Sequence, residues 1–292
     1  MPASPAATLA LLHGDGSFSW TRFEVHASVL VGCLLFAWLY LWAVGPLRRR
    51  HGWGEPAGAG RVTAFLAGTA ILFLSLNGPI HDLSDNYLFS AHMVQHLLIT
   101  LAVPPLFLIG TPPWLLRPLL RPGPLRTAAG FLTSPFVAFT IYNVVFAGWH
   151  FPAAYDLALV NHDVHIVQHL SFIAAAVIMW WPIAGPVQGL SRLSSPLQLL
   201  YIFALGLPMS IVAAFISLSS SVVYDFYAEV PRIFGISALE DQQIGGLIMW
   251  VPGMIVFWCA MTIVFFRWAA REERADRRSS APDQRLAGAS AP

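Results

Sequence analysis

The chain has 292 residues, of which 57% are hydrophobic and only 11% are charged, and its formal net charge is +1. Soluble domains carry about a quarter charged residues, so this composition excludes an ordinary soluble enzyme and a disordered chain. The small net charge argues against a nucleic-acid partner, and two isolated cysteines, Cys33 and Cys259, form no disulfide framework.

Seven apolar stretches are long enough to cross a lipid bilayer, which takes about 20 residues of α-helix. We expect these spans at residues 25–45, 62–79, 88–109, 131–150, 163–184, 197–219 and 243–266. Some contain prolines, where neighbouring helices can satisfy the carbonyl that a proline leaves free. The predicted fold is all-α: a polytopic membrane helix bundle with seven transmembrane helices in residues 25–266, after an external segment of residues 1–24.

The arginines predict the orientation of the bundle in the membrane. Fourteen of the sixteen lie in the connections after the first, third and fifth spans or in the tail, against Arg22 and Arg232 on the other side. Because positive charge is retained in the cytoplasm, we expect the amino terminus outside and the carboxyl tail inside. Residues 267–292 mix charge with Ala, Ser, Gly and Pro, which predicts a disordered cytoplasmic tail.

Histidines follow the spans in a repeated pattern on the predicted outer side. The third span begins with His92-Met-Val-Gln-His96-Leu, and the fifth begins with a segment that contains His165-Ile-Val-Gln-His169-Leu. The span before each one also ends in a histidine. The match indicates two related helix pairs that carry histidines at the same depth.

Each pair places two imidazoles on one helix face, because residues four apart differ by about 40° around the axis and about 6 Å along it. If the third and fifth spans face each other, four imidazoles meet below the outer surface. Neutral imidazole binds copper, zinc and iron, and ionisable groups within membranes usually face a bundle interior. The pattern therefore predicts a metal site. Its core ligands would be His92, His96, His165 and His169, and its exchange ligands would be His81, His150 and His162.

Other roles for these histidines stay open. A single histidine within a membrane often only hydrogen-bonds between helices, and the chain would then be a metal-free scaffold. Opposed histidines can also hold haem as axial ligands, which would make the chain a membrane electron carrier or oxidoreductase. Two macrocycles would, however, crowd histidines about 6 Å apart on one helix, and one haem would leave half of the cluster unused.

Six polar residues near the histidines could orient the imidazole N–H groups from a second layer. They are Asp82, Asp85, Asp163, Asp241, Gln95 and Gln168. The acids could instead cap helices or remain in solvent, and Asp163 stands where an N-cap is expected. Met93, Met249 and Met254 carry thioethers that copper can use, but packing is the expected role for each within a helix.

Common catalytic motifs do not occur in the sequence. The paired histidines lack the glutamate of an H-E-x-x-H zinc protease, and neither a G-x-S-x-G elbow nor a phosphate-binding G-x-x-x-x-G-K-[ST] loop is present. The sequence therefore gives no support to zinc-protease, serine-hydrolase or P-loop chemistry.

Four segments together resemble one protein family. They are Asn77-Gly-Pro-Ile-His81-Asp-Leu, Ala91-His-Met-Val-Gln-His96-Leu-Leu, His162-Asp-Val-His-Ile-Val-Gln-His169 and Asp241-Gln-Gln-Ile-Gly-Gly-Leu-Ile-Met-Trp250. Over roughly residues 25–266 the chain is similar to the CtaG-type cytochrome c oxidase assembly factors. The resemblance implies a multi-pass protein of the bacterial plasma membrane, surrounded by lipid, whose partner is the catalytic subunit of a haem–copper oxidase.

The same resemblance implies a role in bringing copper to the copper B centre of the oxidase. The chain lacks the cysteine pair of the single-span copper chaperones that share the family's name, so copper would have to bind to histidine. The expected function is therefore oxidase assembly with copper at an outer histidine cluster, by a protein that is not an enzyme. A haem-binding carrier and a metal-free assembly scaffold are the alternatives.

Overall fold

The computed structural model describes residues 18–21, 23–187 and 189–289, with side chains described as far as residue 278. Within these ranges all regular structure is helical, which agrees with the predicted fold class. Most of the expected external segment, including Arg22, lies outside the described residues.

The described chain folds into a series of helices. The first half holds α2 (Ala27–Trp42), the π-helix η1 (Ala43–Leu47), α3 (Arg48–His51), α4 (Ala59–Ser75), α5 (Gly78–Asn86), α6 (Phe89–Leu97), the π-helix η2 (Leu98–Ala102), α7 (Val103–Gly110) and α8 (Pro113–Leu116). The second half holds α9 (Pro124–Leu132), α10 (Pro135–Trp149), α11 (Pro152–Val160), α12 (His162–Ala184), α13 (Ser195–Ser217), α14 (Asp225–Glu229) and α15 (Ala238–Ala289).

Five helical segments are each long and apolar enough to cross a membrane. They are Ala27–His51, Phe89–Gly110, His162–Ala184, Ser195–Ser217 and Ala238–Arg278. Two further pairs qualify only when taken together: α4 with α5, bent by 44°, and α9 with α10, bent by 65°. The described chain therefore has five to seven candidate spans, and each of the seven predicted spans overlaps one of them.

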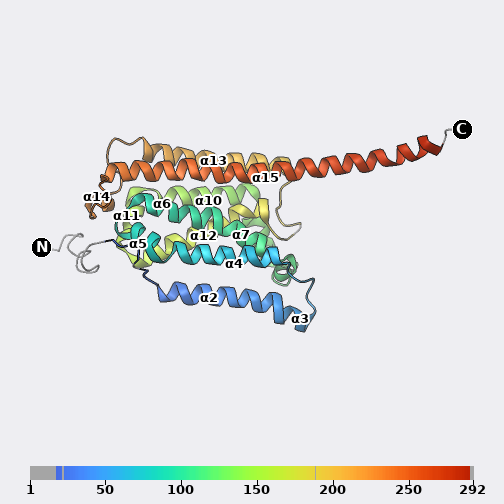
Figure 1. Ribbon diagram of the computed structural model, residues 1–292, viewed down its shortest axis with the longest axis horizontal. Helices are drawn as coiled ribbons and strands as arrows, with labels where there is room; N and C mark the ends of the chain where they lie inside the picture. The colour runs from blue at the N-terminus through green and yellow to red at the C-terminus, as the bar shows by residue number, and fades with distance from the viewer. Residues whose placement is uncertain (1–17, 22, 188, 290–292) are drawn as a thin grey trace.

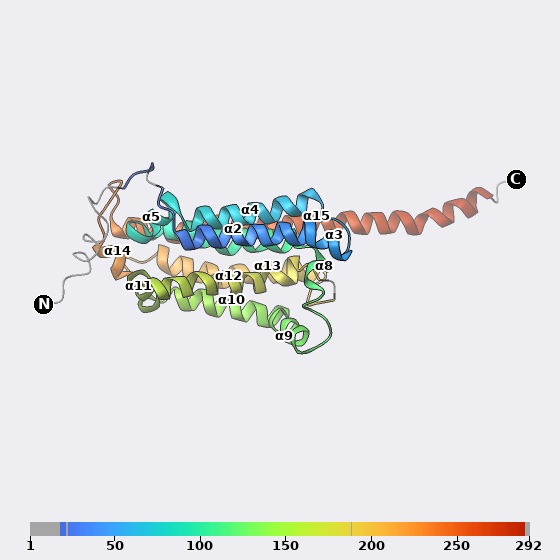
Figure 2. The same ribbon diagram turned by 90° about the horizontal axis from the view of Figure 1, so that it is seen from below.

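The two ends of the bundle carry different side chains. The short helices α5, α11 and α14 gather at one end, and α3 and the carboxyl-terminal part of α15 lie at the other (Figures 1 and 2). We call the first the histidine end, after His81, His92, His150 and His162. We call the second the arginine end, after Arg48, Arg61, Arg117 and Arg192. The predicted outer and cytoplasmic sides correspond to these two ends.

The span of α6, η2 and α7 forms the centre of the bundle together with α12. In each, 56% of the apolar stretch is buried by protein, against 11% for α2, which lies at the edge against α4 (Figure 1). Exposed apolar side chains such as Leu34, Trp38, Ile211 and Phe215 cover the outer helices, as expected where a helix faces lipid.

A proline explains how α12 is fixed to the central span. Pro104 has no N–H, so the carbonyl of Thr100 loses its usual partner one turn along the helix. The helix widens there into η2, and Trp180 of α12 donates its indole N–H to that carbonyl at 3.1 Å. The Thr100 hydroxyl donates to the carbonyl of His96 at 2.6 Å. The indole hydrogen bond holds α12 beside the helix that carries the first histidine pair.

The start of α6 is held by α15. The buried carboxylate of Asp241 accepts hydrogen bonds from the backbone N–H groups of Phe89, at 2.8 Å, and Ser90, at 3.1 Å. One turn later Gly245 lets the two helices touch, because a Cβ at this position would lie 3.2 Å from the Ser90 backbone. The cap and the close contact together set the position of His92, one turn further along α6.

The carboxyl end differs from its prediction. The sequence predicts a disordered tail from residue 267, whereas α15 continues as a helix to Ala289. The segment is rich in Ala, Arg and Glu, which are strong helix formers. Residues four apart also support it: Arg277 pairs with Glu273 at 2.7 Å, and the indole of Trp268 donates to Glu272 at 2.9 Å.

Candidate metal site

Helices α6 and α12 bring four imidazoles together at the histidine end. The ring centroids of His92 and His96 on α6 are 4.1 Å apart, and those of His165 and His169 on α12 are 4.3 Å apart. Across the two helices, His92 lies 5.5 Å from His165, and His96 lies 5.5 Å from His169. All four are buried. The third and fifth predicted spans therefore face each other through their matched pairs.

Three of these imidazoles converge closely enough to share one ion. One ring nitrogen from each of His92, His165 and His169 lies within 4.8 Å of the other two, and we call this group the histidine triad. Metal–nitrogen bonds of about 2.0–2.1 Å place ligand nitrogens about 3.4 Å apart in a tetrahedral site. Binding therefore needs the rings to close by about an ångström, which rotations about the side-chain bonds can supply.

Hydrogen bonds at His92 leave one of its nitrogens free for a metal. Its Nδ1 lies 3.0 Å from the hydroxyl of Tyr227 and 2.8 Å from that of Tyr155. Burial raises the pKa of both hydroxyls well above its ordinary value, so both keep their protons. Tyr227 donates its proton to the Ser84 carbonyl and so accepts from Nδ1–H. Tyr227 therefore favours the tautomer with the proton on Nδ1, which leaves Nε2 of His92 with its lone pair.

His165 is oriented in a similar way by a carboxylate. Asp85 Oδ2 lies 3.5 Å from His165 Nδ1, and a neighbouring carboxylate favours the tautomer with the proton on that nitrogen. Within the described part of the chain, Nε2 of His92, His165 and His169 is in each case buried without a hydrogen-bond partner. Leaving one such nitrogen unpaired costs about 1–3 kcal/mol of stability. An ion bound by all three nitrogens would remove this cost at each of them.

His96 lies beside the triad rather than within it. Its ring is 5.5 Å from His169 and 6.3 Å from His150, and neither of its buried nitrogens has a partner among the described residues. His150, which follows α10, donates from Nδ1 to the carbonyl of Phe146 at 2.7 Å and leaves Nε2 unpaired. The predicted core ligand His96 therefore stands between the triad and His150.

His81 differs from the other predicted ligands because both of its nitrogens are engaged. Gln95 donates its amide N–H groups to the Ser75 carbonyl, at 2.7 Å, and to His81 Nδ1, at 3.1 Å. The other nitrogen of His81 faces Asp85 at 3.4 Å. His81 must give up one of these partners before it can bind a metal.

The buried amide of Gln168, beside His169 on α12, has no hydrogen-bond partner among the described residues.

A cavity of about 280 Å³ lies beside the triad, between the start of α2 and α12. Its lining includes His26, His81 and the exposed His162, together with the triad members His165 and His169. Burial and the neighbouring ring of His81, 4.7 Å away, lower the pKa of His26, so this imidazole is neutral and able to bind metal at neutral pH. Imidazoles thus line a path from the surface to the triad.

Three of the predicted second-layer acids serve other purposes. Asp82 accepts a hydrogen bond from a neighbouring asparagine of α5 at 2.9 Å, and Asp241 caps α6. Asp163 is exposed, and Asn161 rather than Asp163 caps α12, accepting from two backbone N–H groups at 3.0 and 3.2 Å. In the described chain these acids touch no imidazole, since a side-chain amide engages Asp82, backbone N–H groups engage Asp241 and Asp163 faces solvent. Asp85 alone of the four contacts the site.

Three residues of the site were not predicted from the sequence: His26, Tyr155 and Tyr227. The tyrosines lie in α11 and α14, and no spacing in the sequence relates them to His92. His26 reaches the site through a motif that the sequence does show, because its backbone N–H donates to the side chain of Asn77, the first residue of Asn-Gly-Pro, at 2.7 Å. The Asn-Gly-Pro motif therefore ties the start of α2 to the turn before α5, where Gly78 adopts a φ of +68°.

Comparison with known proteins identifies the family. The family model described as cytochrome c oxidase caa3 assembly factor matches residues 38–271. An uncharacterized protein of Mycobacterium bovis is 26% identical over 249 residues, which cover 80% of this chain and 37% of the relative. One from Mycobacterium leprae is 26% identical over 238 residues, covering 74% and 35%. The chain thus spans about a third of the length of these relatives. No solved structure matches.

Proposed function

Because the chain belongs to the family of cytochrome c oxidase caa3 assembly factors, we propose that it assists oxidase assembly by holding copper at the histidine triad. It would pass this copper to the catalytic subunit of a haem–copper oxidase, where the copper B centre is formed. The metal is cargo in this proposal, and the chain acts as a carrier in the bacterial plasma membrane rather than as an enzyme.

One observation carries the proposal: three buried imidazoles each bring a ring nitrogen within 4.8 Å of the other two, and the Nε2 of each ring lacks a hydrogen-bond partner in the described chain. A triad that only packed two helices together would pair these nitrogens with one another or with backbone groups, because unpaired polar atoms within a membrane are costly. Tyr227 and Asp85 instead engage the opposite nitrogens of His92 and His165. This second layer is the arrangement that orients histidine ligands in metal sites.

The same geometry suits release as well as binding. A triad leaves a coordination position open, and an ion held by three neutral imidazoles can be taken over by an incoming ligand. The adjoining cavity of about 280 Å³ brings His162 and His26 to the same side of the site. These two imidazoles would serve as exchange ligands between the triad and the surface.

Haem fits this cluster less well than a single ion does. A porphyrin has to lie between its two axial nitrogens, with its ring extending well beyond them on every side. The rings of His92 and His96 are only 4.1 Å apart, and His165 is 5.5 Å from His92. Imidazoles packed this closely leave no slot for a macrocycle between them.

Copper binding to the purified, detergent-solubilised protein tests the proposal. The chain is loaded with Cu(I) under reducing conditions and its copper content is measured by mass spectrometry. The His92→Ala/His169→Ala variant should hold about one copper ion fewer per chain than the wild type, because a single remaining imidazole cannot retain it. His51→Ala, at the arginine end, removes an exposed histidine and serves as the matched control.

Two outcomes would contradict the ligand assignment. The first is wild-type copper content in the double variant, provided that its circular dichroism shows intact helix. The second is an equal loss in the His51→Ala control, which would indicate non-specific binding to histidine. A Soret absorption band from the protein purified from its host would instead favour haem.

A further inference from the structure

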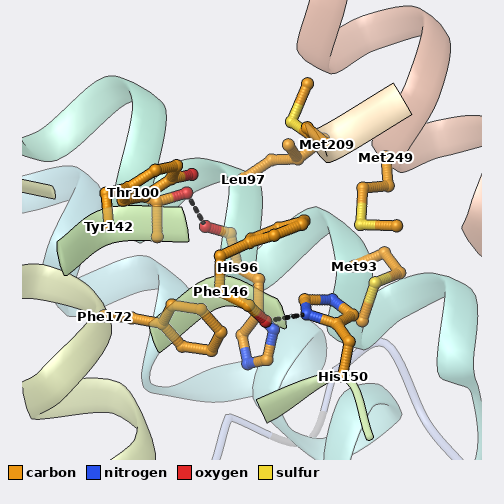
Figure 3. A pocket seen from close by; sticks show the side chains of 10 residues that line it. All are labelled: Met93, His96, Leu97, Thr100, Tyr142, Phe146, His150, Phe172, Met209 and Met249. Carbon is orange, nitrogen blue, oxygen red and sulfur yellow. Dashed lines mark hydrogen bonds between the residues drawn. The ribbon is translucent and has the colours of Figure 1, made fainter. Parts of the chain in front are cut away.

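A second pocket lies beside the triad and has a different chemistry. It is enclosed by α6, α10, α12, α13 and α15, and its volume is about 10 Å³. Two imidazoles, His96 and His150, line it together with the thioethers of Met93, Met209 and Met249 (Figure 3). Packing is the role that the sequence predicts for methionines of these helices. Their arrangement around unpaired imidazoles calls for a different interpretation.

Both imidazoles of this pocket have buried ring nitrogens that are free to bind a ligand. His150 donates from Nδ1 to the carbonyl of Phe146, and its Nε2 has no partner in the described chain. Both nitrogens of His96 are likewise buried and unpaired within the described residues. In the close-up view His150 lies next to Met93, with Met249 on the same side (Figure 3).

The methionines of this region fall into two groups. Met254 is outside the pocket, and its sulfur lies 2.8 Å from the position that a Cβ on Gly206 would take. The methyl group of Met209 likewise lies 2.7 Å from the position that a Cβ on Gly253 would take. Met93 and Met249 are both buried and both line the pocket. Their side chains lie on the same side of the pocket as His150 (Figure 3), which makes them the candidate sulfur ligands.

The size and lining of the pocket select its occupant. A volume of about 10 Å³ holds one atom-sized species and no organic group. Thioethers and aromatic rings do not stabilise a hydrated hard cation or an anion, whereas Cu(I) prefers thioether and imidazole ligands. A water molecule between His96 and His150 is the competing occupant, although thioethers are poor hydrogen-bond partners for water.

We propose that Met93, Met249 and His150, with His96 shared between the two sites, form a second copper site that is selective for Cu(I). This inference rests on the proposed function and extends it. His96 lies 5.5 Å from His169 of the triad and 6.3 Å from His150, so an ion can move between the sites while His96 stays bound. The thioether site would hold copper in its reduced state within the bundle, and the triad would exchange it at the histidine end.

X-ray absorption at the copper edge tests this site in the full-length, Cu(I)-loaded protein. The wild type should bind about two copper ions per chain and show a copper–sulfur scattering path. The Met93→Leu/Met249→Leu variant should lose that path and about one copper ion, because leucine conserves volume but cannot bind copper. Met254→Leu, on the same helix as Met249, should retain both.

The outcomes separate the two proposals. A wild type without copper–sulfur scattering, or a double variant that retains it, overturns the thioether site. Neither result affects the triad, whose copper has nitrogen ligands only and is lost in the His92→Ala/His169→Ala variant. A chain that binds no copper at all contradicts both. The wild-type spectrum alone decides the question if the methionine variant fails to fold.

Discussion

At the scale of single residues, the site depends on which nitrogen of each imidazole carries its proton. Tyr227 holds the Nδ1–H of His92, and Asp85 faces the Nδ1–H of His165. Each interaction favours the tautomer in which Nε2 keeps its lone pair, and Nε2 of both rings is buried without a hydrogen-bond partner in the described chain. The hydroxyl and the carboxylate would thus contribute to copper affinity without touching the ion.

Tyr227→Phe removes one hydroxyl from this arrangement. The variant should bind copper at the triad about tenfold more weakly with unchanged stoichiometry, because His92 loses one partner that fixes its tautomer. Competition with a Cu(I) chelator measures the affinity. Tyr201→Phe is the control, since its buried hydroxyl donates to the carbonyl of Met179, away from the triad. Equal weakening in both variants would show that the effect comes from packing.

At the scale of helices, α15 positions α6. Asp241 accepts from the N–H groups of two residues that precede His92 by two and three positions, and Gly245 lets the helices touch. On the opposite side, Trp180 of α12 donates to the carbonyl that Pro104 leaves free. The first histidine pair is therefore held between two helices that meet it through buried hydrogen bonds.

Asp241→Ala should weaken this contact. Removing a buried helix cap costs about 0.5–2 kcal/mol of stability, which a lower unfolding temperature of the solubilised protein would report. Copper affinity should fall as well, because His92 moves with the start of α6. Asp163→Ala is the matched control and should leave both quantities unchanged, since the Asp163 side chain is exposed. An Asp241→Ala variant as stable as the wild type would contradict the capping role.

Much of this site follows from spacing alone, and some of it does not. The four-residue spacing puts His92 with His96 and His165 with His169 wherever the helices form, and facing helices then unite them. Which carboxylates reach the imidazoles depends on the path of the chain between spans. For this reason Asp85 contacts the site and Asp241 does not. For the same reason the sequence does not predict Tyr155 and Tyr227, which come from α11 and α14.

At the carboxyl end, composition predicts less regular structure than the chain forms. Its composition of Ala, Gly, Ser, Pro and charged residues predicts disorder, yet α15 continues through it. Local helix propensity and pairs such as Arg277 with Glu273 extend a helix that the bundle has already started. The composition of the segment does not show that it continues a helix whose first turns have already formed in the bundle.

At the scale of the whole molecule, most of the described arginines and most of the described histidines lie at opposite ends of the bundle. The excess of arginine at one end predicts that this end faces the cytoplasm. The histidine end would then face outward, where copper is loaded and exchanged. The lipid-facing surface of α2 and α13 would remain available to the oxidase subunit during assembly.

Labelling of introduced cysteines tests this orientation. With Cys33 and Cys259 replaced by alanine, Glu229→Cys at the histidine end should react with a membrane-impermeant maleimide in intact cells. Arg121→Cys at the arginine end should react only after permeabilisation, because the reagent cannot cross the bilayer. Both positions are exposed in the fold. The reverse pattern would contradict the predicted orientation.

Delivery of copper from the triad to the oxidase is tested most directly by the copper content of the assembled oxidase. Cells that lack this chain are complemented with the wild type, with His92→Ala/His169→Ala or with His51→Ala, and the oxidase is purified from each. We expect normal haem in all three and depleted copper B only with the double variant. An oxidase with full copper from those cells, at equal levels of the assembly factor, would contradict copper delivery and leave a metal-free scaffold.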